Sequence, residues 1–181
     1  MDFHGQKTLP AARSIKELED MLDSNYTYIV LLNSHIGQLK SLVQLAKSKG
    51  KKMLLHADLV QGLRNDEYAA QFLCQDVKPA GLISTRKNVV LTAKKHGLIS
   101  IQRLFLLDSI ALESSYKLLE TTKPDYIEVL PGVMPHIIKE VYEKTGIPIV
   151  AGGLIRERRE VENALKAGAS AVTTSRRELW K

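Results

Sequence analysis

Short apolar runs alternate with longer segments in which apolar residues recur at helical spacing, from one end of the chain to the other. Runs of this kind are typical of buried parallel strands, and the longer segments are typical of amphipathic helices. The pattern predicts eight strands: Thr8 to Ala12, Tyr28 to Leu32, Lys52 to Ala57, Gly81 to Thr85, a run within Leu98 to Leu107, Tyr126 to Leu130, a run from Pro148 that ends in Gly152 and Gly153, and Ala171 to Thr174.

Helix signals fall between these runs. Ser14 and Glu17 have the spacing of a capping box, and Asp108 is placed to cap a later helix. The expected helices run from Ser14 to about Leu22, up to Gly50, near Asp66 to Gln75, from Asn88 to His96, from Asp108 to about Glu120, from Pro135 to Gly146, and before Gly168.

Strand and helix in strict alternation predict an α/β fold with a parallel sheet. Eight such units favour a small single-domain (β/α)8 TIM barrel over residues 1–181, with an open doubly wound sheet as the alternative. The last helix is almost absent, since the chain ends in Leu179, Trp180 and Lys181. We expect this shortness to leave an apolar patch that a partner subunit covers in a homo-oligomer.

Composition favours an intracellular protein. The chain is 44% hydrophobic and contains one cysteine, Cys74, so no disulfide can form within it, and Cys74 is expected in the core. No run is apolar enough to span a bilayer, and the N-terminal residues have no apolar signal core. We therefore expect a cytoplasmic location and no membrane partner.

The net charge of +6 is unevenly distributed. The stretch from Val77 to Leu107 has six basic residues and no acid, and the stretch from Ile155 to Lys181 has seven basic residues and four acids. Clustered Lys and Arg are suited to a nucleic-acid backbone, although many basic enzymes bind none. The candidate RNA contacts are Arg86, Lys87, Lys94, Lys95, Arg156, Arg158 and Arg159.

The two last predicted strands end in small or hydroxyl residues: Gly152 and Gly153 follow one, and Thr174 and Ser175 end the other. In a parallel barrel the backbone amides of these loops form a phosphate site. Ser175 and Glu178 have the spacing of a capping box that opens a short final helix. The alternative is that the glycines only permit a turn and Ser175 only caps.

Polar residues near other strand ends predict the rest of a ligand site: Arg13, His56, Asp58, Arg103 and Glu128. Alternation places His56 and Asp58 on one side of their strand. A carboxylate in the apolar run of Glu128 is costly to bury unpaired, so we expect Glu128 to accept hydrogen bonds from ligand hydroxyls and an arginine to bind phosphate. A structural pair of Arg103 with Glu128 is the alternative. No HExxH or CxxC spacing accompanies these residues, and we expect no metal and no cofactor.

Six segments of the sequence resemble one family. They are HADLVQGLRNDEYAAQFLCQ at 56–75, KPAGLISTR at 78–86, IQRLFLLD at 101–108, KPDYIEVLPGVMP at 123–135, GIPIVAGGLI at 146–155 and AVTTS at 171–175. Together they are similar to the glycerol uptake operon antiterminator regulatory proteins, nearly from end to end.

The resemblance implies a TIM-barrel regulator without catalytic residues. Its effector would be sn-glycerol 3-phosphate, and it would act on the leader mRNA of glycerol-utilisation genes to prevent premature termination of transcription. Two other functions stay open on the residues alone. One is a barrel enzyme for a phosphorylated substrate (isomerase, aldolase or phosphodiesterase) that uses His56, Asp58 and Glu128, and the other is a homomeric scaffold with a vestigial phosphate site.

Overall fold

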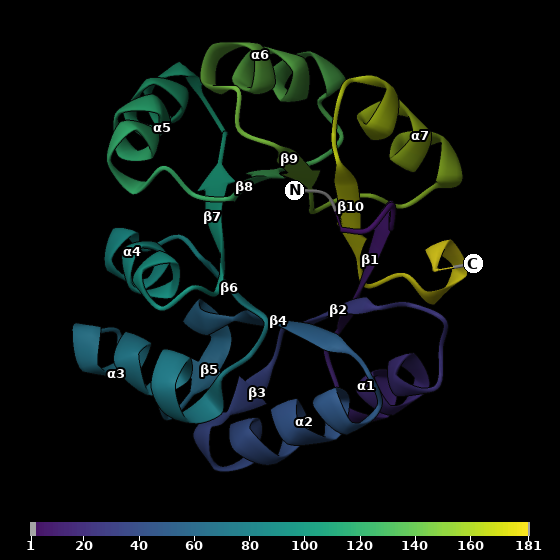
Figure 1. Cartoon of the computed structure of the whole chain (residues 1–181). Coiled ribbons are helices and arrows are strands. Elements are labelled where there is room, and N and C mark those ends of the chain that lie inside the picture. The colour runs from purple at the N-terminus through teal and green to yellow at the C-terminus, as the bar shows by residue number, and fades with distance from the viewer. Residues whose placement is uncertain (1–2, 181) are drawn as a thin grey trace.

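The computed structural model describes residues 3–180 and contains a closed barrel of eight parallel strands inside a ring of helices (Figure 1). The barrel strands are β1 (Thr8–Ala12), β2 (Tyr28–Leu31), β4 (Lys52–His56), β6 (Gly81–Ser84), β7 (Ile99–Phe105), β8 (Tyr126–Leu130), β9 (Ile149–Ala151) and β10 (Ala171–Thr174). Their order is sequential, and β1 closes the ring against β10 with Pro10 beside Thr174. The expected barrel is confirmed, and the open sheet is excluded.

Seven α-helices cover the barrel in the described residues: α1 (Ile15–Leu22), α2 (Ile36–Ser48), α3 (Glu67–Phe72), α4 (Lys87–Lys95), α5 (Ser109–Thr122), α6 (Pro135–Thr145) and α7 (Arg158–Lys166). Ser14 caps α1 and Asp108 caps α5 through side-chain oxygens that accept backbone N–H groups, as their positions predict. None of these helices has the length and apolar character needed to cross a membrane.

One small element has no counterpart in the predicted pattern. β3 (Ser34–His35) pairs in parallel with β5 (Val60–Gln61) above the barrel strands that precede them, with a single 3-10 turn at Ala57–Leu59 between β4 and β5. A π-helical segment at Leu73–Val77 extends α3 and contains Cys74, which is buried as predicted.

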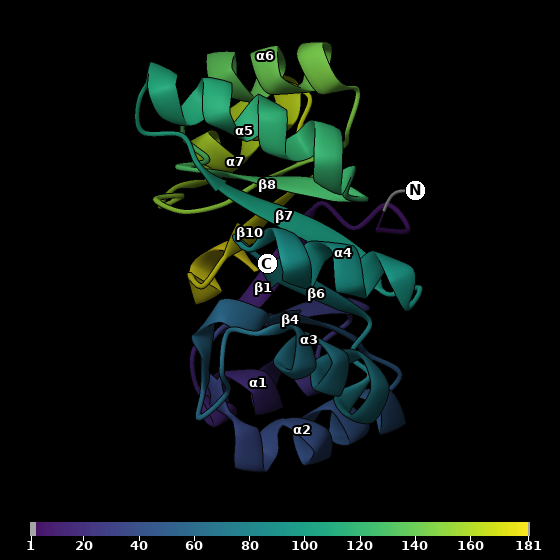
Figure 2. The same cartoon turned by 90° about the vertical axis from the view of Figure 1, so that its left-hand side faces the viewer.

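The barrel interior is apolar in its lower and middle layers. Inward residues of all eight strands form one buried cluster: Leu9, Ala11, Tyr28, Val30, Leu54, Ile83, Ile101, Tyr126, Val150 and Ala171. Phe3 closes the amino-terminal end, with its ring stacked on Tyr126 at 4.3 Å between centroids and edge-on to Tyr28 at 5.1 Å. Figure 2 views the barrel from the side, with the N-terminus at its right-hand end.

No full helix follows β10. A three-residue 3-10 helix, Arg177–Leu179, stands between α7 and α1, where Figure 1 labels the C-terminus. The hollow beside it has a volume of about 530 Å³ and is lined by Met21, Tyr26 and Trp180 with four polar residues. The short last helix is thus confirmed, and its covering by a second subunit stays a prediction.

The expected capping box of Ser175 and Glu178 is wrong. The residue that precedes the 3-10 helix is Arg176, and no side chain caps the helix. Instead Thr174 Oγ1 accepts the N–H of Arg176 at 3.1 Å, because the chain turns directly at the end of β10. A single 3-10 turn has no helix dipole to offer a phosphate, so anion binding at this end rests on strand-end amides and arginines.

Candidate functional site at the carboxyl end of the barrel

The uppermost layer of inward-facing side chains is polar. It is formed by His56 of β4, Arg103 of β7, Glu128 of β8 and Thr173 of β10, directly above the apolar layers. Arg103 and Glu128 are partners in the register of β7 and β8, which brings their side chains together. Four of the eight barrel strands thus supply one polar layer.

Glu128 is the buried centre of this layer, with an exposed fraction of 4%. Thr173 Oγ1 donates a hydrogen bond of 2.9 Å to Glu128 Oε1. Glu128 Oε2 lies 3.6 Å from Arg103 Nε, which is an ion-pair distance but too long for a hydrogen bond. Both of these atoms lack a hydrogen-bond partner in the structure. An unpaired buried carboxylate oxygen beside an unpaired N–H is a place for a ligand hydroxyl.

Burial raises the pKa of Glu128, and the nearby Arg103 and the Thr173 hydroxyl oppose that shift. Arg103 Nη1 donates to Nε2 of His56, which fixes the imidazole as the neutral tautomer with its proton on Nδ1. Burial lowers the pKa of His56 to about 4, with Arg103 adding to the shift and Asp58 opposing it. The layer therefore holds a neutral histidine, an arginine and a carboxylic group that ionises reluctantly.

Gly152 provides the space for this arrangement. A Cβ at residue 152 would lie 2.5 Å from Thr173 Oγ1 and 2.7 Å from Glu128 Oε1. Both distances are shorter than side chains tolerate, so only glycine fits beside the hydrogen-bonded pair. The sequence-based reason for this glycine, a close approach to phosphate, applies better to Gly153, which has a positive φ of 76° and lines the cavity.

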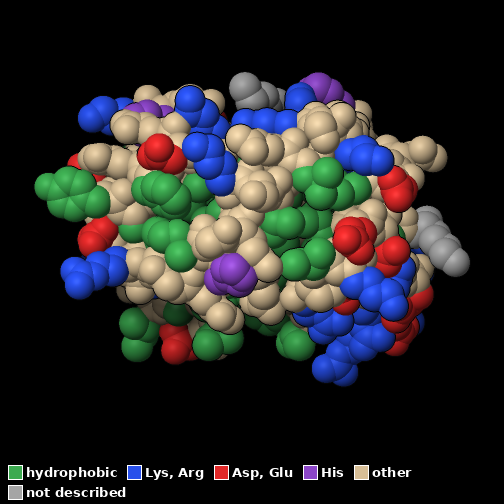
Figure 3. Space-filling view, turned by 90° about the horizontal axis from the view of Figure 1, so that it is seen from below, with side chains coloured by type: hydrophobic (Ala, Val, Ile, Leu, Met, Phe, Trp, Pro, Cys, Tyr) green, Lys and Arg blue, Asp and Glu red, His purple; other side chains and the backbone are tan. Residues whose placement is uncertain are grey.

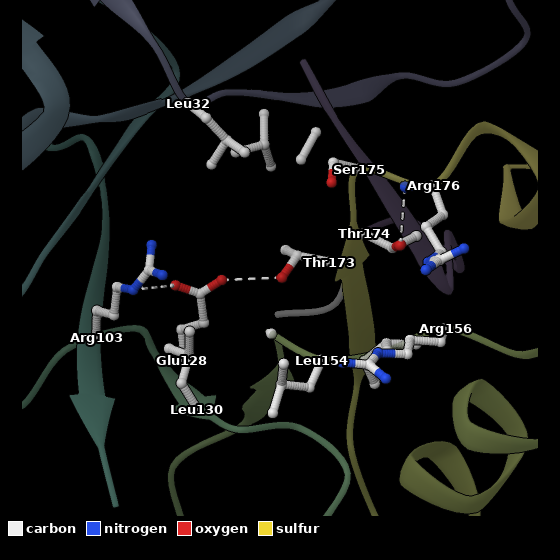
Figure 4. Close-up of a pocket in the computed structure, with 14 residues that line it drawn as sticks. Leu32, Arg103, Glu128, Leu130, Leu154, Arg156, Thr173, Thr174, Ser175 and Arg176 are labelled. Carbon is white, nitrogen blue, oxygen red and sulfur yellow. Dashed lines mark hydrogen bonds and ion pairs between the residues drawn. The ribbon is translucent and has the colours of Figure 1, made fainter. Parts of the chain in front are cut away.

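A cavity of about 250 Å³ opens above the polar layer. Figure 4 shows Arg103 and Glu128 pointing toward one another on its floor, with Thr173 on the other side of the carboxylate. The walls are lined by Ala11, Val30, Leu32, Leu130, Gly153, Leu154, Ile155, Arg156, Thr174, Ser175 and Arg176. Its size and its few converging polar groups are suited to a small polar ligand.

The rim of the cavity has the features of an anion site. The backbone N–H groups of Gly153 and Ser175 make no hydrogen bond to another described residue between 3 and 180. Arg156 and Arg176 line the same side, and Figure 4 places them next to the ends of β9 and β10. Arg176 is exposed and pairs with Glu178 at 3.0 Å, a surface contact weak enough to be exchanged for a ligand.

The structure gathers part of the sequence-predicted ligand set around this cavity. Arg103, Glu128, Gly153, Thr174 and Ser175 line it, and Gly152 lies directly behind Glu128. His56 reaches the site only through Arg103.

Two predicted ligand residues lie elsewhere. Arg13 is exposed, pairs with Glu17 at 3.6 Å and lines a neighbouring hollow. Asp58 is not on the same side as His56, because β4 ends at His56 and Asp58 belongs to the following 3-10 turn. Its carboxylate accepts hydrogen bonds from Ser84 and Thr85. Burial raises the pKa of Asp58, but these hydrogen bonds together outweigh it, so the pKa is lowered. Arg86 Nη1 lies 3.8 Å from Asp58 Oδ1.

The lining also includes residues that were not predicted from the sequence as ligand contacts: Thr173, Leu154, Arg156 and Arg176, of which Arg156 was predicted to contact RNA. Period-2 alternation within β10 would have identified Thr173, since Ala171 and Thr173 share the inward face. Within the described residues, no group of three or more His, Cys, Asp or Glu side chains is arranged to hold a metal ion.

The predicted RNA contacts divide between the two ends of the barrel. Arg86 and Lys87 lie at the start of α4, beside the cavity end, whereas Lys94 and Lys95 lie at its last turn, at the opposite end. Arg156, Arg158 and Arg159 surround the start of α7 at the cavity end. They do not form one surface.

Comparisons with known proteins show which family this chain resembles. Residues 8–180 match the family described as glycerol-3-phosphate responsive antiterminator. The structure of a glycerol uptake operon antiterminator regulatory protein from Listeria monocytogenes superposes with a TM-score of 0.94 at 47% identity, covering 97% of this chain and 95% of that one. A glycerol uptake operon antiterminator-related protein from Thermotoga maritima gives 0.85 at 30% identity over 99% of each chain.

Two further similarities differ in what they show. The uncharacterized protein YgcP of Escherichia coli is 34% identical over 181 residues, which cover 98% of this chain and 95% of YgcP. Deoxyribose phosphate aldolase from Aeropyrum pernix gives a TM-score of 0.68 at 18% identity, over 94% of this chain and 84% of the aldolase. At that identity the aldolase shares the barrel fold alone.

Proposed function

The chain belongs to the glycerol-3-phosphate responsive antiterminator family, and from that premise we propose that it is a cytoplasmic, non-enzymatic sensor that binds glycerol 3-phosphate in the barrel mouth and acts on the leader mRNA of glycerol-utilisation genes. The observation that carries the ligand assignment is the buried Glu128 oxygen without a partner, on the floor of a cavity with arginines at its rim. A small molecule with hydroxyls at one end and phosphate at the other matches this polarity.

In the proposed complex the two ends of the ligand meet different parts of the site. Glu128 accepts a hydrogen bond from a ligand hydroxyl while Arg103 donates to one. The amides of Gly153 and Ser175 and the guanidinium groups of Arg156 and Arg176 bind the phosphate. The apolar walls face the carbon chain. No residue of this set needs to change its covalent state, which suits a sensor.

A thermal-shift panel tests the ligand. Purified protein is titrated with glycerol 3-phosphate, glycerol, inorganic phosphate and dihydroxyacetone phosphate. We expect glycerol 3-phosphate to raise the free energy of unfolding by about 2.7 kcal/mol at a hundredfold excess over its dissociation constant. Glycerol and phosphate each satisfy half of the site and should give much smaller shifts. Equal responses to all four compounds, or none, would contradict the assignment.

RNA binding needs its own test. Gel shifts with labelled leader transcript, at several salt concentrations and with or without glycerol 3-phosphate, should show affinity that falls with salt and rises with the effector. A tenfold effect of the ligand corresponds to about 1.4 kcal/mol of coupling, which a few charge-assisted hydrogen bonds supply. Affinity indifferent to both variables would refute the RNA half of the proposal while leaving the ligand half standing.

The alternative is an enzyme for a small phosphorylated substrate, and the raised pKa of Glu128 is the observation in its favour. The second acid–base group such an enzyme needs is less available, because His56 Nε2 is occupied by Arg103 and Asp58 is turned toward Ser84. Turnover of a triose phosphate or a glycerophosphodiester that Glu128→Gln abolishes would decide for the enzyme.

A further inference from the structure

The positive charge of this protein is concentrated at the end of the barrel opposite the ligand cavity. The segments that lead into the barrel strands are 4–7, 23–27, 47–52, 76–80, 94–98, 121–125, 143–148 and 166–170, and they contain eleven lysines, four carboxylates and no arginine, a net charge of +7. The lysines are Lys7, Lys47, Lys49, Lys51, Lys52, Lys78, Lys94, Lys95, Lys123, Lys144 and Lys166. We call this surface the lysine face.

Several lysines of the lysine face reach across to the loops of neighbouring strands. The Lys94 ammonium donates to the carbonyl of Lys123, and Lys7 donates to the carbonyl of Ser170 at 3.5 Å. Lys51 donates to the carbonyl of Tyr26 at 2.8 Å. These contacts hold the charges in place without neutralising them.

Four arginines at the cavity end differ in this respect, whereas Arg156 and Arg159 have no carboxylate within ion-pair distance among the described residues. Arg13 pairs with Glu17, Arg86 with Asp58, Arg176 with Glu178 and Arg177 with Asp20. On the lysine face, among the described residues, only Lys49 and Lys144 have a carboxylate within ion-pair distance, at 3.4 and 3.8 Å. Figure 3 shows blue side chains along its upper edge, the lysine face, and a separate blue cluster interleaved with red at its lower right.

We propose that the leader RNA binds the lysine face, at the amino-terminal end of the barrel, and that the effector and the RNA occupy opposite ends of the molecule. This inference rests on the proposed antiterminator function. Unpaired lysines attract a phosphate backbone through counterion release, whereas arginines already paired with carboxylates have to break those pairs first. The exposed ring of Tyr142 in the last turn of α6 is placed at the same end, where it offers a stacking surface for an unpaired base.

Separate sites also fit a protein that must hold two anions at once. An RNA on the cavity rim would compete with the ligand phosphate for Arg156 and Arg176, which line the cavity. An RNA on the lysine face leaves those arginines to the ligand. Saturating glycerol 3-phosphate should then never displace bound RNA.

The test compares two triple variants with the same loss of charge. The first is Lys47→Gln, Lys78→Gln and Lys95→Gln, three exposed residues of the lysine face. The matched variant is Lys16→Gln, Lys87→Gln and Arg159→Gln, three exposed residues at the cavity end. Both are measured by fluorescence anisotropy with labelled leader transcript at several salt concentrations, and by thermal shift with glycerol 3-phosphate.

We expect the lysine-face variant to lose affinity for RNA by roughly tenfold or more, and the slope of log K against log salt to fall by about three. The cavity-end variant should stay within twofold of the unsubstituted protein. Loss in the cavity-end variant alone, equal loss in both, or displacement of RNA by glycerol 3-phosphate would overturn the proposal. If the unsubstituted protein binds no RNA, the RNA half of the proposed function fails with it. An unchanged ligand response in both variants shows that the fold and the cavity are intact.

Discussion

Gly152 lies against the buried carboxylate of Glu128, so closely that a Cβ at residue 152 would stand 2.7 Å from Oε1. The same Cβ would stand 2.5 Å from Thr173 Oγ1, which donates to that oxygen. The glycine and the carboxylate are therefore one structural unit. The position of Glu128 in the cavity depends on the absence of a side chain directly after the neighbouring strand β9.

Gly152→Ala should displace Glu128 and weaken both the fold and the ligand site. Overpacking of this kind costs about 1–3 kcal/mol. Urea denaturation measures the first effect and isothermal titration with glycerol 3-phosphate the second. Gly37→Ala is the matched control, because its Cβ would meet only the ring of exposed His35, at 3.3 Å. Unchanged stability and affinity in Gly152→Ala would show that the carboxylate does not need this space.

The Glu128→Gln variant tests whether Glu128 contacts the ligand or only forms a structural ion pair with Arg103. The amide oxygen can still accept the Thr173 hydroxyl, but the charged acceptor for a ligand hydroxyl is lost. We expect the affinity for glycerol 3-phosphate to fall by about 1.5–3 kcal/mol, tenfold or more. Titration calorimetry measures it. If affinity is retained and only the melting temperature changes, the pair of Arg103 with Glu128 holds the barrel together and does not bind ligand.

The arginines that line the cavity rim should contribute more to the affinity for glycerol 3-phosphate than an arginine outside the cavity. Arg156→Gln and Arg176→Gln are each expected to weaken the binding of glycerol 3-phosphate by about 1–3 kcal/mol, because a contact to the phosphate is lost. The response to glycerol, which has no phosphate, should be unchanged. Arg13→Gln is the control, since Arg13 lines a neighbouring hollow. A larger loss of affinity with Arg13→Gln than with the other two variants would indicate that the phosphate binds nearer to β1.

His56 should make the protein sensitive to mild acid. With its pKa lowered to about 4, the folded protein binds fewer protons than the unfolded chain between pH 4 and about 6.5. The free energy of unfolding therefore falls as pH falls through that window, by about 3 kcal/mol in total, and the loss is complete below pH 4. His56→Gln removes this component and keeps an acceptor for Arg103. Chemical denaturation from pH 7 to 4 should give a shallower loss for His56→Gln; parallel curves would mean that His56 titrates normally.

Phe3 should carry a large share of stability for a residue so near the chain end. Its ring is buried between Tyr28 and Tyr126, and Phe3→Ala removes those contacts at a cost of about 3–5 kcal/mol. Urea denaturation measures this cost. Ligand affinity well below the melting temperature should be unchanged, because the cavity lies at the other end of the barrel. A small effect would mean that solvent or a neighbouring side chain fills the vacated space.

The fold could be predicted from the sequence because each strand is an apolar run with a helix signal after it. Tyr126 to Leu130 and Ala171 to Thr174 match β8 and β10 to the residue. The small parallel pair of β3 and β5 was missed, because two-residue strands carry no periodicity. Ser175 was misplaced as a cap for a similar reason: a capping pattern does not reveal how tightly the chain turns after β10.

The alternation of side chains located site residues correctly where it was applied within the bounds of a strand. Alternation alone places Glu128 inward, and register then brings Arg103 to it. Asp58 was assigned by extending the alternation past the point where β4 ends. The distribution of basic residues over the surface was harder still to predict from the sequence. Lys78, Arg86, Lys87, Lys94 and Lys95 lie close in sequence, yet α4 carries its first and last basic residues to opposite ends of the barrel.

The packed apolar layers of the barrel separate the ligand cavity from the amino-terminal end. Phe3, Tyr28 and Tyr126 close that end, so in the proposed complex glycerol 3-phosphate enters and leaves the cavity at the carboxyl end of the barrel. The segment 152–156 frames that entrance and includes Leu154 in the left-handed region at a φ of 59°. In the proposed complex, the residence time of the effector would therefore depend on the residues at this one rim.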